Sequence, residues 1–223
     1  SVRSFGQELN DALYALAAAL NLLIPSSGAR PHATQPSFSA LLTRFAHAQR
    51  TLWRDAQGGL SLGVTTLFWG AGATLQFVVL AWAQDNLSLS LSHAAYLQGV
   101  VAIGIGVGAL AAGRWVRLHQ APRVLQLGVL MGACVPLLTL VHSVGVAAPL
   151  LATVGALAGF FVVPMNALLQ HRGQQLLGAG ESIAVQNFNE NLSVLVMLCL
   201  YAVLVWLDVP VGIVIVLFGT FVC

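Results

Sequence analysis

The chain has 223 residues, of which 58% are hydrophobic and 7% are charged, and its formal net charge is +2. A soluble domain has about 25% charged residues, so these few charges cannot cover a water-facing surface. The predicted class is an all-α, polytopic membrane protein. The small net charge gives no electrostatic argument for nucleic-acid binding. The three cysteines lie in apolar runs without paired spacing, which argues against a disulfide framework or a zinc site.

Seven apolar segments follow one another along the chain, judged against the ~20 residues that a membrane-spanning helix needs. They are residues 9–24, 60–83, 94–115, 124–141, 147–170, 182–206 and 209–223. Pro164 lies inside the fifth segment and predicts a kink, whereas Pro149 falls in its first turn, where proline suits a helix. The first segment is short, the last is incomplete and the sequence starts without methionine, so we expect an interior piece of a longer protein.

The basic residues indicate the orientation in the membrane. All nine are arginines, and all but Arg3 lie in the connections 26–59, 114–123 and 171–181, whereas the connections between these carry none. Cytoplasmic loops of membrane proteins carry an excess of basic residues. The three arginine-bearing connections are therefore predicted to be cytoplasmic, and 84–93 to be periplasmic.

The connection 26–59 contains an amphipathic stretch, SFSALLTRFAHAQRTLWRD (37–55). At helical spacing its apolar face comprises Phe38, Leu41, Leu42, Phe45, Leu52 and Trp53. The opposite face carries Arg44, His47, Arg50 and Arg54. Such a basic amphipathic helix either lies flat at the cytoplasmic interface among anionic headgroups or packs on the underside of the protein itself.

The sixth segment opens with polar side chains. If its helix starts at Ser182, Gln186 and Glu190 lie one turn apart, as do Asn187 and Asn191, and the four form a polar stripe. An ionisable group inside a membrane costs of the order of 2–3 kcal/mol and usually faces a cavity or a partner. The alternative is a helix N-terminus among headgroups, where an acid suits the helix dipole. Because Glu190 lies about two turns into the helix, we predict the cavity.

Other polar residues are scattered singly through the apolar segments. They are Gln76, Gln98, Gln126 and Asn166. Each is more often an interhelical hydrogen bond than a binding group, although backbone groups freed at Pro164, next to Asn166, can line a cavity. The spacing of Gly104 and Gly108 predicts close helix packing. The sequence offers no phosphate loop, metal cluster or nucleophile–base pair, so we predict no enzyme, no metal and no cofactor.

The order of these elements resembles the middle and second half of a major facilitator superfamily transporter, which has two six-helix halves. Four stretches closely resemble the bacterial lysophospholipid transporter family of the inner membrane. They are TTLFWGAGATLQF (65–77), VAIGIGVGA (101–109), GFFVVPMNALLQHRG (159–173) and GAGESIAVQNFNEN (178–191). The superfamily loop motif at GALAAGRWVR (108–117) lacks its usual acidic residue, and Gln76 stands where family members carry an arginine.

This resemblance implies a division into three parts. Residues 1–25 would be the last helix of the N-terminal half, residues 26–59 a cytoplasmic linker, and residues 60–223 helices seven to an incomplete twelve. It also implies a facilitator, embedded among membrane lipids, that moves lysophospholipids such as lysophosphatidylethanolamine to the cytoplasmic leaflet of the bacterial inner membrane. There an acyltransferase would restore the second chain.

The polar residues of the sixth segment fit this task independently of the resemblance. Glu190 would hold the headgroup ammonium, with Asn187 and Asn191 as hydrogen-bonding neighbours. Gln186, Asn166 and Gln76 are further candidates, and the single acyl tail would lie in an apolar flank between helices. Two alternatives stay open: a facilitator for a drug or sugar, and a non-transporting membrane scaffold, in which these polar residues would be structural.

Overall fold

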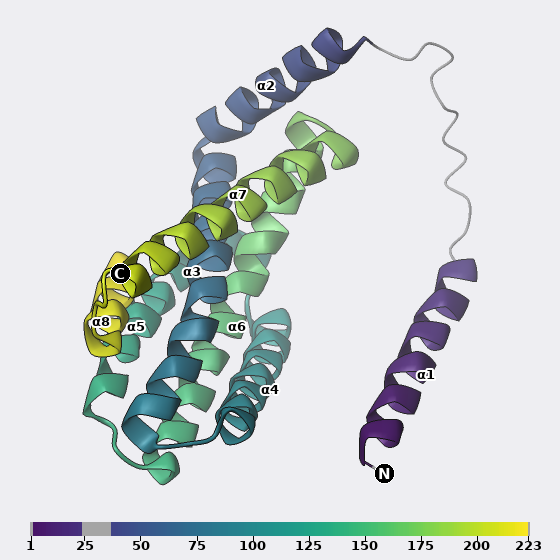
Figure 1. Ribbon diagram of the computed structural model, residues 1–223. Coiled ribbons are helices and arrows are strands. Elements are labelled where there is room, and N and C mark those ends of the chain that lie inside the picture. The colour runs from purple at the N-terminus through teal and green to yellow at the C-terminus, as the bar shows by residue number, and fades with distance from the viewer. Residues whose placement is uncertain (1, 24–36, 223) are drawn as a thin grey trace. The chain divides into compact units, whose positions relative to one another are not determined.

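The computed structural model describes residues 2–23 and 37–222, and every regular element in these two ranges is a helix (Figure 1). The chain forms two compact units, Ser1–Ala40 and Leu41–Cys223. The first unit contains α1 (Val2–Leu22). This helix covers residues 9–22 of the predicted segment 9–24, and the assignment of residues 1–25 to a preceding half stays a prediction.

The second unit is a bundle of long helices joined by short turns. Its α-helices are α2 (Phe38–Arg54, which begins in the first unit), α3 (Ala56–Leu87), α4 (Leu91–Trp115), α5 (Leu125–Cys134), α6 (Val144–Leu176), α7 (Ala179–Trp206) and α8 (Val211–Val222). α4 packs along α6, and α7 crosses α3 obliquely (Figure 1). α6 is one helix that contains both Pro149 and Pro164, and the kink at Pro164 stays a prediction.

One predicted helix is interrupted. Residues 124–141 were expected to form a single α-helix, but only α5 is α-helical, and short 3₁₀ segments, η1 (Leu118–Val124) and η2 (Val135–Leu140), flank it. Pro122 lies inside η1 and Pro136 near the start of η2. Proline lacks the amide hydrogen that a regular α-helix needs, so these positions favour the tighter turns.

Five helical stretches of the described chain are long and apolar enough to cross a membrane. They are Ala56–Leu87, Leu91–Trp115, Leu118–Leu140, Val144–Leu176 and Ala179–Trp206. This finding confirms the predicted class of an all-α polytopic membrane protein and agrees with a major facilitator arrangement.

The tightest helix pair is α4 with α6, and small residues allow the approach. A Cβ atom added at Gly104 would collide with the backbone of Ala152, and one added at Gly108 would collide with the backbone of Ala156. Because lipid tails are as apolar as leucine, membrane helices associate through such close packing rather than through exclusion from water. The predicted packing role of the two glycines is confirmed.

Candidate functional site

Three of the predicted site residues meet where α6 and α7 touch. The Gln186 side-chain amide donates to Glu190 Oε1 at 2.9 Å and to Asn166 Oδ1 at 3.1 Å. Asn166 comes from α6, whereas Gln186 and Glu190 lie one turn apart on α7. All three side chains are half-buried. The structure therefore adds Asn166 of α6 to Gln186 and Glu190, which the sequence already placed one turn apart.

A fourth residue, Thr65 of α3, joins this group. Thr65 is fully buried, and its hydroxyl lies within hydrogen-bonding reach of Glu190. The same hydroxyl donates to the carbonyl of Leu62 at 3.2 Å. Sequence reasoning missed Thr65, because a threonine in a membrane helix commonly bonds to its own backbone and gives no separate signal.

The Glu190 carboxylate makes no ion pair within the described part of the chain. The neighbouring amide and hydroxyl groups stabilise it but do not neutralise it, and a carboxylate in a membrane span is costly without a cation or water. The Glu190 carboxylate is partly exposed and is oriented by Gln186. It can therefore bind a cationic group of a ligand through a charge-assisted hydrogen bond.

The predicted four-residue stripe on α7 divides into two. Asn187 and Asn191 are exposed, and the Asn191 side chain donates to the backbone carbonyl of Asn187 at 2.7 Å. Successive residues in an α-helix point about 100° apart, so these amides lie beside Gln186 and Glu190 on the more exposed side of α7. Gln186 and Glu190 are half-buried and Asn187 and Asn191 are exposed, and a shared role of the four residues stays a prediction.

Asn189 has a structural role that the sequence did not reveal. It is buried, and its side chain donates to Gln49 Oε1 of α2 at 2.8 Å and to the carbonyl of Val185 at 2.7 Å. It therefore ties α2 to α7. The helical spacing of Ser182, Val185 and Asn189, all buried, was the available signal for this packed face.

Gln76 lies apart from the Glu190 group. It follows Thr65 by eleven residues on α3, which corresponds to about 16 Å along the helix axis. Its backbone carbonyl accepts a hydrogen bond from the Gln98 side chain of α4 at 2.9 Å, and its own side chain is exposed. Gln76 therefore lies outside the group around Glu190.

Gln76 and Gln98 border a cavity of about 290 Å³ inside the bundle. Its walls come from α3, α4, α5, η2 and α6, with Val222 of α8, and apart from the two glutamines the lining residues are apolar or glycine. A site with these walls suits an apolar ligand group.

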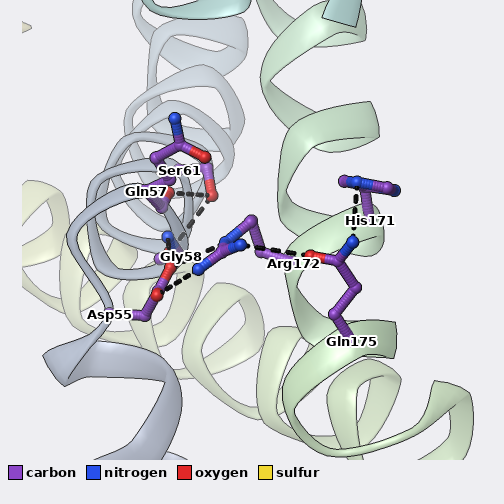
Figure 2. A network of polar contacts seen from close by, with 7 residues as sticks. All are labelled: Asp55, Gln57, Gly58, Ser61, His171, Arg172 and Gln175. Carbon is purple, nitrogen blue, oxygen red and sulfur yellow. Dashed lines mark hydrogen bonds and ion pairs between the residues drawn. The ribbon is translucent and has the colours of Figure 1, made fainter. Parts of the chain in front are cut away.

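An ion pair fixes the turn between α2 and α3 (Figure 2). Asp55 caps α3 by accepting the Gly58 amide at 2.7 Å, and Arg172 of α6 donates to both carboxylate oxygens, at 2.5 and 3.0 Å. These hydrogen bonds, above all the one from Arg172, lower the pKa of the Asp55 carboxyl below its ordinary value. A second pair joins Arg44 to Glu181 at 2.6 Å. The connections around residues 55 and 172, predicted to share one side of the membrane, thus lie together.

The predicted helix at 37–54 is confirmed as α2, and part of its apolar face packs on the bundle. Leu52 is fully buried with Ala48 against Leu62, Leu169 and Val185, and Phe45 packs beside them. Leu41, Leu42 and Trp53 of the same helix are about half-exposed. Packing on the protein's own underside therefore describes the C-terminal half of α2, and contact of its exposed apolar residues with lipid stays a prediction.

Comparison with known proteins adds curated relatives. The chain is 45% identical over 200 residues, 89% of its length, to a protein named "Lysophospholipid transporter LplT" from Yersinia enterocolitica. It has the same identity and coverage with proteins of that name from Yersinia pestis and Yersinia pseudotuberculosis. No family model matches, and no solved structure matches. The chain spans about half the length of these relatives, 49–50%. These similarities confirm the predicted resemblance of the chain to the bacterial lysophospholipid transporters.

Proposed function

We propose that the chain is part of a facilitator that moves lysophospholipids across the bacterial inner membrane. The proposed substrates are lysophosphatidylethanolamine-like lipids, which reach the cytoplasmic leaflet and are then re-acylated by an acyltransferase. The name of the relatives supports the substrate class. The observation that carries the proposal for this chain is the half-buried Glu190 carboxylate, which has polar neighbours but no cation among the described residues.

The geometry suggests a role for each residue of the group. Glu190 would accept the headgroup ammonium, because a zwitterionic headgroup brings the positive charge that this carboxylate lacks. Gln186 uses its amide hydrogens on Glu190 and Asn166 and would thereby hold the carboxylate in position. The exposed side-chain amides of Asn187 and Asn191 would form hydrogen bonds with the phosphate and glycerol groups of a lipid that approaches the exposed face of α7.

The transport step itself forms and breaks no covalent bond, and the later re-acylation belongs to the acyltransferase. The relatives are named as transporters, and binding with alternating exposure of the site is sufficient for transport. A facilitator of another small molecule is the second candidate, but the few polar groups around Glu190 and the apolar cavity nearby favour a substrate with one polar end and one apolar tail.

The test is uptake of lysophosphatidylethanolamine by vesicles that contain the full-length protein. Losing a charge-assisted contact costs about 1.5–3 kcal/mol, so Glu190→Gln should lower transport roughly ten- to hundred-fold at unchanged folded yield. Glu181→Gln is the matched control, because Glu181 lies on the same helix but pairs with Arg44 at the surface, and it should transport nearly as well as the wild type.

A headgroup without an ammonium, such as that of lysophosphatidylglycerol, should respond less to Glu190→Gln. The proposal fails if the wild type takes up no lysophospholipid, or if Glu190→Gln transports lysophosphatidylethanolamine normally. If Glu190→Gln lowers folded yield and leaves transport per folded molecule intact, the residue is structural and the proposed headgroup role is wrong.

A further inference from the structure

Side chains of α2 contact α7 along its first three turns. In order along α7, these contacts are Arg44 with Glu181, Phe45 with Phe188, and Gln49 with Asn189. The series ends at Asn189, the residue directly before Glu190. A helix outside the five candidate membrane spans therefore contacts α7 next to the carboxylate to which the proposed function assigns the headgroup.

The last contact of the series is the buried one. The side chains of Arg44 and Glu181 are 61% and 38% exposed, and ion pairs so open to solvent contribute little. Asn189 is only 9% exposed, and Gln49 is half-buried. Losing one partner of a buried hydrogen bond is costly, because the remaining polar group is left without water. The hydrogen bond from Asn189 Nδ2 to Gln49 Oε1, 2.8 Å long, is therefore the polar contact through which α2 constrains α7 most strongly.

We propose that Gln49 is a positioning residue for transport, which sets the rotation of α7 through Asn189 and thereby directs Glu190 toward the lipid headgroup. This inference rests on the proposed function. Asn189 and Glu190 are neighbours on one helix, so a rotation of α7 moves both. Side chains end about 5–6 Å from a helix axis, so a rotation of about 20° moves the Glu190 carboxylate by about 2 Å. A shift of that size would also break the 3.1 Å hydrogen bond from Gln186 to Asn166.

Two hydrogen bonds between side-chain amides thus define the rotation of α7 near the site. Gln186 donates to Asn166 of α6, and Asn189 donates to Gln49 of α2. Without the second bond, α7 would be held here by one amide contact, and the carboxylate would sample orientations that do not favour the headgroup. A purely structural role for Gln49 makes a different prediction, because it would lower the uptake of every lipid equally.

The experiment measures uptake of lysophosphatidylethanolamine and of lysophosphatidylglycerol by vesicles that contain the full-length protein. Gln49→Ala should lower the ratio of the first uptake to the second about three- to tenfold at unchanged folded yield, because the ammonium is the group that needs Glu190. Adding Gln49→Ala to Glu190→Gln should leave the ratio close to that of Glu190→Gln alone, because residues that act through one contact are not additive.

Two further variants provide the control and the rescue. Gln57 is an exposed glutamine in the first turn of α3, and the bond from Ser61 goes to its backbone carbonyl (Figure 2). Gln57→Ala should therefore keep the wild-type ratio. Gln49→Asn shortens the acceptor side chain and should lower the ratio. Combining it with Asn189→Gln restores the summed length of the two side chains and should recover the ratio.

The inference is wrong if Gln49→Ala lowers uptake of both lipids equally, leaves the ratio unchanged, or adds its full effect to that of Glu190→Gln. If Gln49→Ala does not fold, Gln49→Asn and the exchanged pair carry the test. A wild-type ratio in Gln49→Asn, or no recovery in the exchanged pair, then overturns the inference. A wild type that takes up no lysophospholipid, or a Glu190→Gln variant with normal transport, refutes the proposed function instead.

Discussion

Alanine substitutions at Leu52 and Leu42 should have different effects on stability, because Leu52 lies on the packed face of α2 and Leu42 on its exposed face. Leu52 is fully buried in the cluster with Ala48, Leu62, Leu169 and Val185, and these contacts attach α2 to three membrane helices. Leu42 of the same helix is 54% exposed. Leu52→Ala therefore removes core packing, whereas Leu42→Ala removes the same atoms from a site that has little packing to lose.

The expected magnitudes follow from these two environments. Leucine-to-alanine substitutions at fully buried sites cost about 2–5 kcal/mol, because a cavity remains where the side chain was. Surface substitutions generally stay within about 0.5 kcal/mol. Leu52→Ala should therefore lower the free energy of unfolding by several times the effect of Leu42→Ala.

Denaturation of the purified protein in mild detergent, followed by circular dichroism, measures the stability difference. Hydrogen exchange of the α2 amides then reports whether the helix detaches locally, and Leu52→Ala should raise exchange across Ala48–Arg54. Equal effects of the two substitutions on both measurements would refute the docking of α2 on the bundle and favour a helix held by lipid alone.

Two further predictions concern the arginine-bearing side of the protein. Cysteines introduced at Ser37 and Ser88, in a background without the native cysteines, should react with an impermeant reagent from opposite sides of the membrane, and reaction from one side would contradict the predicted topology. The pKa of Asp55 is lowered by Arg172, so this carboxylate contributes stability that is fully present above its ordinary pKa and is lost as the pH falls through the lowered folded pKa. The melting temperatures of wild type and Asp55→Asn should therefore converge as the pH falls below about 4. A difference that stays constant with pH would show that the ionised carboxylate adds no stability.

Much of the fold could be predicted because the membrane imposes simple requirements on a sequence. The apolar segments need a minimum length, and arginines mark alternate connections, so the described spans fall close to their predicted positions. The start of α3 was harder to place, because Gly58 and Gly59 look like helix breakers. In the structure both lie in the first turn of α3, where an added Cβ at Gly59 would strike the carbonyl of Trp53. The sharp turn after α2 requires glycine there, and only the packing of the two helices reveals this.

The candidate site was predictable in part. The spacing of Gln186 and Glu190 placed them together on one face, but nothing in the sequence gives the rotation of α7 about its own axis. That rotation turns Asn189 toward α2, leaves Asn187 exposed and brings Thr65 of α3 to the carboxylate. Helical periodicity tells which residues of one helix share a face. Contacts with neighbouring helices determine which of these faces points toward the site.

The distribution of arginines around Glu190 bears on what neutralises its charge. Arg172 is held by Asp55 and Arg44 by Glu181, so the two arginines that form ion pairs in the described chain are engaged outside the Glu190 group. The position where relatives of the resembled family carry an arginine, Gln76, lies about 16 Å along α3 from Thr65. Because a carboxylate in a membrane span needs a positive charge or water, either water or a cation from beyond these residues meets the charge of Glu190. Under the proposed function, an ammonium on the lipid headgroup would supply that charge only while the substrate is bound, so headgroup binding would be the step that completes the site.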